Sequence, residues 1–145
     1  MKHALHFVFA TLAVMANLAA AAPAADPKAA PCVDHLKRLA TASMMYAQDH
    51  GSKFPTAANG KLAYEQVKSY AQDPGIDNCP AGGKIYLFNT DLSGVALASV
   101  KAPADTPLFI DPAPHSDGTV GIAFADGHVK RFPTVNARRY GGKFK

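Results

Sequence analysis

The stretch Thr119-Val-Gly-Ile-Ala-Phe-Ala-Asp-Gly-His-Val-Lys-Arg-Phe132 places two apolar runs on either side of Asp126-Gly127. A two-residue Asp-Gly between such runs is a strong signal for a β-hairpin with a type I′ turn, whose two central residues both take a positive φ. In that register Val129 lies on the same face as Phe124 and the other large apolar residues of the first strand. The sequence therefore predicts a hairpin with Asp126-Gly127 at its tip.

The segment before the strands predicts two helices. From about Cys32 to His50, apolar and small residues recur at three- and four-residue spacing, which is typical of a helix with one buried face. The residues of this stripe are Leu36, Leu39, Ala40, Ser43, Tyr46 and Ala47. Gly51 is expected to end the helix. Asn59-Gly60 is read as a turn, and a second helix is expected over 61–71.

Short apolar runs over 84–89 and 107–111 predict further strands, whereas 95–100 fits either a strand or a single helical turn. Helices followed by a run of strands indicate an α+β fold. We therefore expect one α+β domain over residues 32–135, in which the N-terminal helix packs on a small antiparallel β-sheet.

Residues 1–24 resemble a secretory signal peptide. Lys2 and His3 give a basic start, residues 4–22 are almost entirely apolar, and Ala22-Pro23-Ala24 offers the small residues that a signal peptidase reads. Cleavage after Ala24 would release the chain into the periplasm or the medium without a membrane anchor. The alternative is an uncleaved anchor, since the apolar run is about long enough to span a bilayer. Residues 25–31 are expected to form a linker.

Length and charge narrow the classes of partner. A chain of 145 residues with a signal peptide fits one domain, and its net charge is only +4. The clearly basic run lies at residues 136–145, which we expect to be a solvated tail. There is no long patch of lysine and arginine interleaved with aromatic residues, so the sequence does not indicate nucleic-acid binding.

The chain has two cysteines, Cys32 and Cys79. In an oxidising compartment, two cysteines and no third predict a disulfide, and two buried thiols are the alternative. No Cys-x-x-Cys is present, so neither a thioredoxin-type pair nor a c-type haem attachment is indicated. Two cysteines this far apart make a poor zinc site unless histidines join them.

Two stretches resemble bacterial type IV pilin-like and type II secretion pseudopilin-like proteins. One resembles the exit of their long helix and comprises Cys32–Leu39, Met45–Asp49 and Phe54-Pro55. The other, His115 followed by Phe124–Lys130, resembles their C-terminal signature of a histidine, nine residues and Asp-Gly. Residues in the order that the family shows lie between them: Cys79-Pro80, Asn89, Leu92–Gly94, Pro103, Thr106 and Asp111.

The chain departs from that family in two ways. Ten residues rather than nine separate His115 from Asp126, and the prepilin leader that opens a long hydrophobic helix is missing. That helix packs each subunit into a fibre. The resemblance therefore implies an exported pilin-like head, and we expect the mature protein to be a monomer or a small oligomer.

Five polar residues near one end of the expected sheet form a candidate metal site: Asp111, His115, Asp117, Asp126 and His128. Aspartates on a loop suit calcium, which related pseudopilin heads can hold in a C-terminal loop, whereas a transition metal prefers the histidines. The alternative is structural: the aspartates serve turns, and His115 bonds a backbone carbonyl.

No nucleophile elbow, P-loop, zincin helix or pair of catalytic carboxylates is present. We therefore expect a non-enzymatic structural or protein-binding accessory of the cell envelope, with pilus or secretion proteins as partners, no nucleic acid, and no cofactor apart from a potential calcium ion. The alternative is a small metal-dependent envelope enzyme that uses Asp111, His115, Asp126 and His128.

Overall fold

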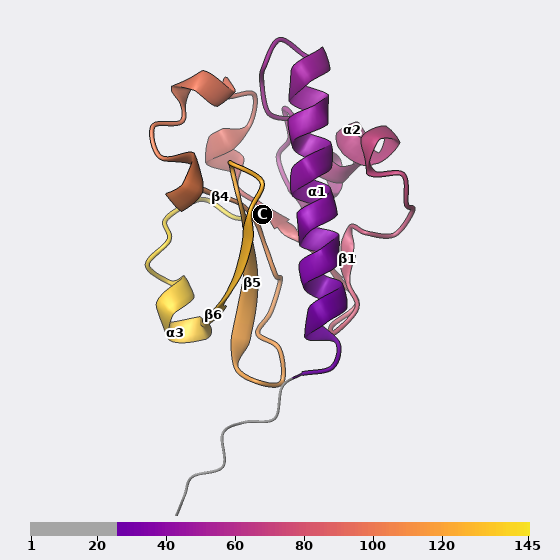
Figure 1. The fold of residues 1–145 in the computed structure, drawn as a ribbon, viewed down its shortest axis with the longest axis vertical. Coiled ribbons are helices and arrows are strands. Elements are labelled where there is room, and N and C mark those ends of the chain that lie inside the picture. The colour runs from indigo at the N-terminus through magenta and orange to yellow at the C-terminus, as the bar shows by residue number, and fades with distance from the viewer. Residues whose placement is uncertain (1–25) are drawn as a thin grey trace, which may run out of the picture.

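A computed structural model describes residues 26–145 (Figure 1). The expected signal peptide lies outside these residues. The helices are α1 (Ala29–Asp49), α2 (Gly60–Ala71) and α3 (Thr134–Ala137), with 3₁₀ turns η1 (Thr90–Leu92), η2 (Leu97–Ser99) and η3 (Pro103–Asp105). The strands are β1 (Asn78–Cys79), β2 (Lys84–Ile85), β3 (Leu87–Phe88), β4 (Pro107–Ile110), β5 (Thr119–Phe124) and β6 (Val129–Pro133). Within the described range, no helix has the length and apolar character needed to cross a membrane.

The sheet and its helix have the predicted arrangement. Strands β3, β4, β5 and β6 pair in that order, each antiparallel to the next, and β1 and β2 form a separate two-stranded ribbon. Helix α1 packs against β4, β5 and β6, with α2 and β1 on its other side (Figure 1). The fold is therefore α+β, with the N-terminal helix on a small antiparallel sheet.

Helix α1 begins three residues earlier than expected. Residues 29–31 belong to its first turn, so the expected linker is shorter than 25–31. Pro31 does not prevent this, because backbone N–H groups in the first turn have no partner within the helix. The buried stripe of the helix includes Leu36, Leu39 and Ala47 as predicted, and Gly51 follows the helix with a φ of 65°.

Helix α2 confirms the prediction over 61–71, but the residues before it are not a turn. Asn59 is the N-cap, and its side chain accepts a hydrogen bond from the Leu62 N–H at 2.9 Å. Gly60 is the first helical residue, and a Cβ there would lie 1.8 Å from the Tyr86 carbonyl oxygen. The expected strand over 84–89 is interrupted at Tyr86, and within 95–100 the chain forms the 3₁₀ turn η2.

The C-terminal run is folded, so the prediction of a solvated tail was wrong. Helix α3 and Tyr140 cover the sheet face opposite α1, where they pack on Val120, Ile122 and Phe124. The last residues then return to the edge of the sheet, where Phe88 and Lys145 exchange two backbone hydrogen bonds. The segment that carries the basic residues is therefore held in place by the apolar face of the sheet and by the free edge of β3.

The hairpin exists, but its loop is one residue longer than predicted. Ala123 pairs with Val129, and the Phe124 N–H bonds the His128 carbonyl at 2.9 Å, which leaves Ala125, Asp126 and Gly127 in the loop. Of the three, only Gly127 has a positive φ, at 91°. This is a type I turn closed by a left-handed glycine, and Asp126 does not need a positive φ.

The extra loop residue changes the face on which β6 presents its side chains. A shift of one residue in register moves every side chain to the opposite face of a sheet. Val129 therefore packs with the core beneath α1 rather than with Phe124, while Phe132 joins Phe124 on the α3 side. In the observed register Phe132 pairs with Val120, and Gly121 pairs with Arg131.

Replacement of Gly127 by valine is expected to destabilise the protein by about 1–3 kcal/mol, because a β-branched residue resists the left-handed conformation that closes the loop. Urea unfolding of the mature chain measures the change. The matched control is Gly141→Val, at an exposed glycine without a positive φ. Equal stability of the two variants would contradict the loop assignment.

Candidate functional site

The structure separates the five predicted metal-site residues into three places. Asp111 and His115 form a buried pair beside α1, and Asp117 bonds Arg131 near the start of the hairpin. Asp126 and His128 lie at the hairpin tip, at the other end of β5. Because β5 lies between the hairpin tip and the other two places, no single ion can bind all five residues. The prediction of one cluster was wrong, and so was the four-residue enzyme site drawn from it.

The Asp111–His115 pair is almost completely inaccessible to solvent. Each side chain is 1 % exposed, and His115 Nε2 lies 2.7 Å from Asp111 Oδ2. Asp111 directly follows β4, and the loop after it returns to β5, where the His115 N–H bonds the Thr119 carbonyl at 2.8 Å. The histidine therefore does not bond a backbone carbonyl through its ring, as the structural alternative supposed, but bonds a carboxylate.

Gly121 allows α1 to approach this pair closely. Its backbone N–H donates to Asp111 Oδ2 at 2.5 Å. A Cβ at this position would lie 2.7 Å from Leu36 Cδ1 and 3.0 Å from Asp111 Oδ2. The missing side chain thus leaves room for both the helix and the carboxylate. A glycine inside a strand can mark such a close approach, and this signal was present in the sequence.

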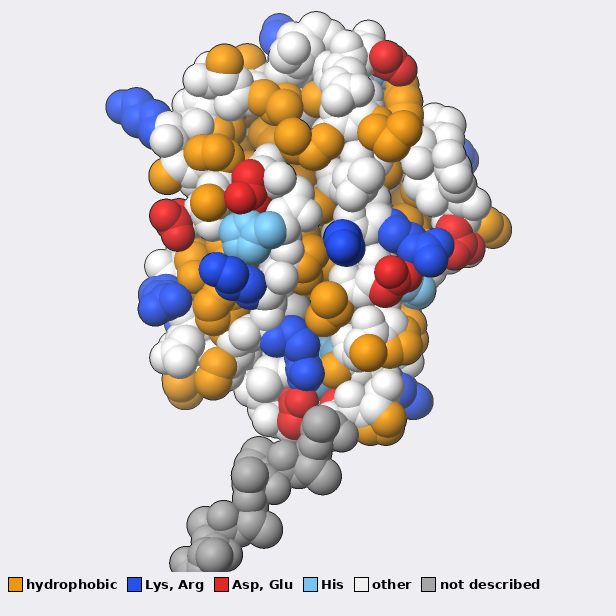
Figure 2. Space-filling view, viewed as in Figure 1, with side chains coloured by type: hydrophobic (Ala, Val, Ile, Leu, Met, Phe, Trp, Pro, Cys, Tyr) orange, Lys and Arg blue, Asp and Glu red, His pale blue; other side chains and the backbone are white. Residues whose placement is uncertain are grey.

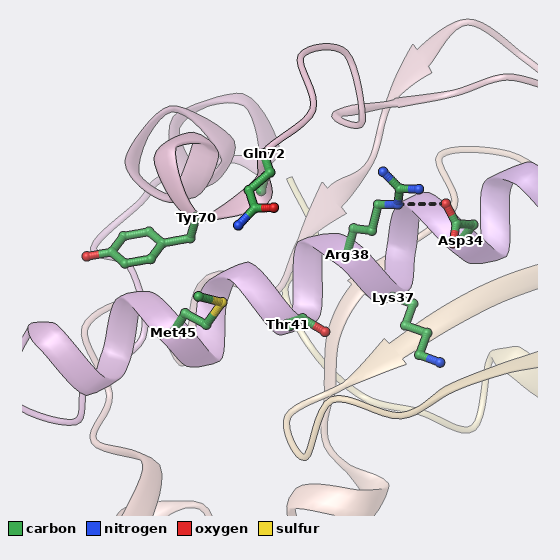
Figure 3. A pocket seen from close by; sticks show the side chains of 8 residues that line it. Asp34, Lys37, Arg38, Thr41, Met45, Tyr70 and Gln72 are labelled. Atoms are coloured by element: carbon green, nitrogen blue, oxygen red, sulfur yellow. Dashed lines mark ion pairs between the residues drawn. The ribbon is translucent and has the colours of Figure 1, made fainter.

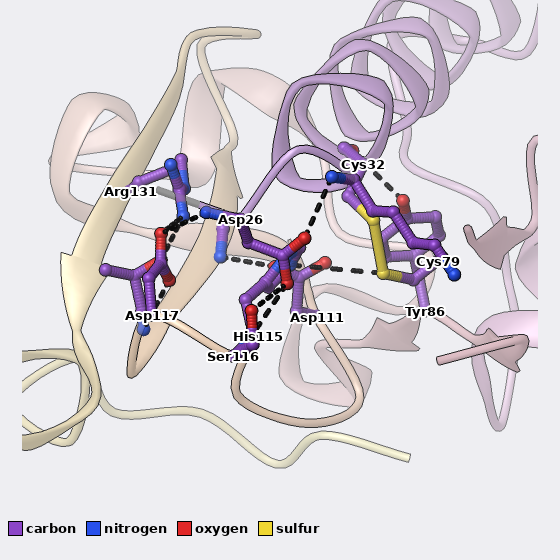
Figure 4. A network of polar contacts seen from close by, with 12 residues as sticks. Asp26, Cys32, Cys79, Tyr86, Asp111, His115, Ser116, Asp117 and Arg131 are labelled. Atoms are coloured by element: carbon purple, nitrogen blue, oxygen red, sulfur yellow. Dashed lines mark hydrogen bonds and ion pairs between the residues drawn. A yellow bond between two sulfur atoms is a disulfide. The ribbon is translucent and has the colours of Figure 1, made fainter. Parts of the chain in front are cut away.

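The predicted disulfide lies next to the pair (Figure 4). Cys32 of α1 and Cys79 of β1 are joined, with their Cα atoms 5.1 Å apart, which confirms the predicted proximity. Cys79 Sγ lies 3.9 Å from His115 Nε2. One potential ligand atom from each of Cys32, Cys79, Asp111 and His115 lies within 4.8 Å of the other three, and all four residues are buried.

Asp26 approaches the histidine from its other side. Its Oδ2 lies 3.9 Å from His115 Nδ1 and accepts hydrogen bonds from the Ser116 N–H at 3.0 Å and the Ser116 hydroxyl at 2.8 Å (Figure 4). The backbone N–H groups of Lys28 and Ser116 and the serine hydroxyl hold the pKa of Asp26 below its usual value. No feature of the sequence indicated this role, because Asp26 fell in the expected linker.

Two buried atoms of the pair have no hydrogen-bond partner within the described chain: Asp111 Oδ1 and His115 Nδ1. Burial raises the pKa of Asp111 above its ordinary value, although the Gly121 N–H and His115 oppose this shift. Tyr86 donates its hydroxyl to the Cys32 carbonyl at 3.0 Å, and burial raises its pKa as well. The cluster thus places polar side chains inside an apolar core, where one carboxylate oxygen and one imidazole nitrogen lack a hydrogen-bond partner within the described chain.

A cavity of about 130 Å³ lies beside the cluster. Its lining includes Asp26, Cys79, His115 and Ser116, together with the prolines of the loop between β4 and β5. A space of this size admits a few water molecules or an ion but no metabolite. The buried cluster therefore has the dimensions of an ion site rather than of a substrate site.

The other two places are structural. Asp117 bonds Arg131 and accepts the Thr119 hydroxyl at 2.7 Å; the threonine and the arginine hold the pKa of Asp117 well below its usual value. Asp126 accepts from the His128 N–H at 3.1 Å and from its ring at 2.5 Å. Burial opposes the shift, but these bonds lower the pKa of Asp126. Both aspartates serve turns, as the structural alternative supposed.

A hollow of about 410 Å³ lies on the outer surface, between α1 and α2 (Figure 3). Its lining mixes charged, polar and apolar side chains: Asp34, Lys37, Arg38, Thr41, Met45, Tyr70, Ala71 and Gln72. Arg38 is held at one end by Asp34 at 2.7 Å and by Asp73 at 2.9 Å. Asp34 and Arg38 are thus already paired, which leaves Lys37 as the one charge of the lining without an ion pair among the described residues.

A second hollow, of about 270 Å³, is apolar and is lined mainly by Met44, Phe54, Leu97, Val100 and Pro103. In the view of Figure 2, hydrophobic side chains gather in the upper part of the face, while lysine and arginine side chains lie across its middle, over α1 and the β5–β6 hairpin. One face thus carries an apolar area beside a charged one.

Comparisons of the chain with protein-family models, with curated proteins and with solved structures found no match.

We expect Asp111→Asn to change how stability depends on pH. Burial raises the pKa of the Asp111 carboxyl in the folded chain. In the unfolded chain this carboxyl loses its proton at a lower pH, near its ordinary pKa of 3.8. The stabilisation by Asp111 is therefore full below that pH and decreases as the pH rises toward the folded pKa. Urea unfolding of both proteins between about pH 3 and about pH 6 should show the wild type losing stability relative to the variant.

Asp126→Asn is the matched control with the opposite sign. The pKa of Asp126 is lowered in the folded chain, so its stabilisation is present above its ordinary value of 3.8 and is lost on acidification. The wild type should therefore gain stability relative to this variant as the pH rises through that region. The same slope for both variants would contradict the assigned difference between the two carboxylates.

Proposed function

We propose that this chain is an exported, non-enzymatic protein-binding module of the cell envelope, built like the head of a type IV pilin or a type II secretion pseudopilin. The observation that carries the proposal is the packing of α1 along one face of the antiparallel sheet, with its outer side left accessible beside α2. The two sequence motifs that resemble this family lie mainly on α1 and on the β5–β6 hairpin. Helix α1 contacts both strands of this hairpin.

The shape of the surface supports protein contact rather than catalysis. The Asp111–His115 pair is almost completely buried, and the cavity beside it is too small for a metabolite. The hollow between α1 and α2 instead mixes apolar and charged side chains, and the second hollow is apolar apart from Asp126. Apolar area bordered by polar groups is the usual composition of a protein interface. The partners that this reading implies are pilus or secretion proteins of the envelope.

The disulfide supports export. Disulfides persist in the periplasm and outside the cell and are rare in the cytosol of mesophiles. Together with the signal-like residues 1–24, the link between Cys32 and Cys79 favours a periplasmic or secreted protein, which we propose to be a monomer or a small oligomer.

Processing of the N-terminus tests the proposed export. The protein recovered from the periplasm or the medium should begin at Ala25, because signal peptidase cleavage after Ala24 removes the apolar segment. N-terminal sequencing and size-exclusion chromatography measure the cleavage and the oligomeric state. Recovery in the membrane fraction with Lys2 still attached would contradict the proposal and favour an anchored subunit.

A photoreactive amino acid at Thr41 tests the proposed docking surface. This residue of α1 is exposed and lines the hollow between α1 and α2, so it should cross-link in intact cells to a pilus or secretion protein. The control is the same amino acid at Val135, which is 76 % exposed on α3 and lies on the opposite face of the sheet. Cross-links of equal yield at both positions, or none at Thr41, would contradict docking at this surface.

A further inference from the structure

We propose that Cys32, Cys79, Asp111 and His115 form a zinc site when the disulfide is reduced. This inference goes beyond the proposed function and does not depend on it. It rests on the convergence of four buried residues, from α1, β1 and the segment after β4, on one point. No feature of the sequence placed the cysteines beside Asp111 and His115.

The set of donor atoms favours zinc over calcium. Thiolate sulfur, imidazole nitrogen and carboxylate oxygen are the three ligand types that Zn²⁺ takes in tetrahedral sites. The two thiolates favour it over harder cations. Calcium requires six to eight oxygen ligands, and Asp111 is the only carboxylate of this four-residue group. These four residues therefore do not supply the cluster of oxygen ligands that the calcium site expected from the sequence would need.

The distances fit a tetrahedral ion with small movements. Metal–ligand bonds of about 2.0–2.3 Å place neighbouring ligand atoms about 3.3–3.8 Å apart. His115 Nε2 already lies 3.9 Å from Cys79 Sγ. The sulfur atoms must move apart when their bond breaks, and His115 Nε2 must exchange its bond to Asp111 for a bond to the metal.

The unused atoms of the pair lie where the site needs them. Asp111 Oδ1 has no hydrogen-bond partner within the described chain, so it is available as a ligand while Oδ2 keeps its bond from the Gly121 N–H. With Nε2 on the metal, His115 Nδ1 carries the proton, and Asp26 Oδ2, now 3.9 Å away, must move closer to accept a hydrogen bond from it. A carboxylate behind a ligand histidine is the usual outer partner in zinc sites.

The chemistry begins with reduction. A dithiol gives two electrons and two protons to the disulfide, the sulfur–sulfur bond breaks, and the reductant closes to its own disulfide. Zn²⁺ then displaces the two thiol protons to solvent and forms two zinc–sulfur bonds. The cavity beside Cys79 and His115 gives the ion an approach to the site.

Zinc binding by the mature chain tests the proposal. One sample is kept oxidised; the other is reduced with dithiothreitol and desalted without oxygen. Both receive Zn²⁺, are desalted again and are analysed for metal. We expect about one zinc per reduced chain and none per oxidised chain. Cobalt in place of zinc should give the thiolate charge-transfer and tetrahedral d–d bands. Equal metal content in the two samples would overturn the proposal.

Variants distinguish zinc binding at this specific site from zinc binding to any free thiol. His115→Gln and the double variant Cys32→Ser/Cys79→Ser should lose stoichiometric zinc. Asp26→Asn should weaken the affinity about 10–100-fold, because it acts through the histidine. His128→Gln, at the hairpin tip, should bind like the wild type. Full affinity in His115→Gln would show that the assigned ligands are wrong, and full affinity in Asp26→Asn would show that Asp26 does not support the ligand histidine.

Circular dichroism covers the case in which reduction unfolds the chain. Zinc should then restore the spectrum of the oxidised protein, because the ion joins the same two cysteines. A reduced chain that stays unfolded with excess zinc would overturn the proposal as firmly as one that is folded and binds no metal.

Discussion

The structure depends on the close approach of α1 to β5 at Gly121. Leu36 of the helix and the Asp111 carboxylate both occupy the space that a side chain there would fill. This contact fixes the separation between the helix and the sheet, and it buries Asp111 where, among residues 26–145, only the Gly121 N–H and His115 bond its carboxylate. The disulfide then holds the N-terminal half of α1 to β1, and a closed loop of this length contributes about 4 kcal/mol in the chain-entropy model.

The elements were predictable because their signals are local. The apolar stripe of α1, the helix over 61–71 and the two strands around Gly127 are each defined by residues close in sequence. The hairpin register was not predictable from these signals. Asp-Gly is compatible with a two-residue turn and with a three-residue loop that ends in a left-handed glycine, and the one-residue difference exchanges the faces of Val129 and Phe132.

The candidate site was less predictable because it is formed by long-range contacts. Sequence spacing placed His128 and Asp126 with His115, since they are near one another along the chain, yet β5 carries them to the opposite end of the sheet. It gave no reason to place Asp26 or the cysteines beside His115, because separations of 36 (115 − 79) to 89 (115 − 26) residues are closed only by tertiary packing. The charges of the C-terminal run suggested a free tail, whereas Tyr140 and the backbone of 143–145 fold it onto the sheet.

A disulfide and a zinc ion are alternative cross-links between the same two elements. Both would join α1 to β1 through Cys32 and Cys79, but the disulfide restricts the unfolded chain, whereas the ion would stabilise the folded chain by binding to it. They differ in what they demand of the surroundings. A disulfide needs no polar neighbours. Beside it, a buried carboxylate–histidine pair whose atoms lack hydrogen-bond partners lowers the free energy of unfolding. A metal ion would use those atoms, so the polar cluster is matched to the metal-bound state better than to the disulfide state.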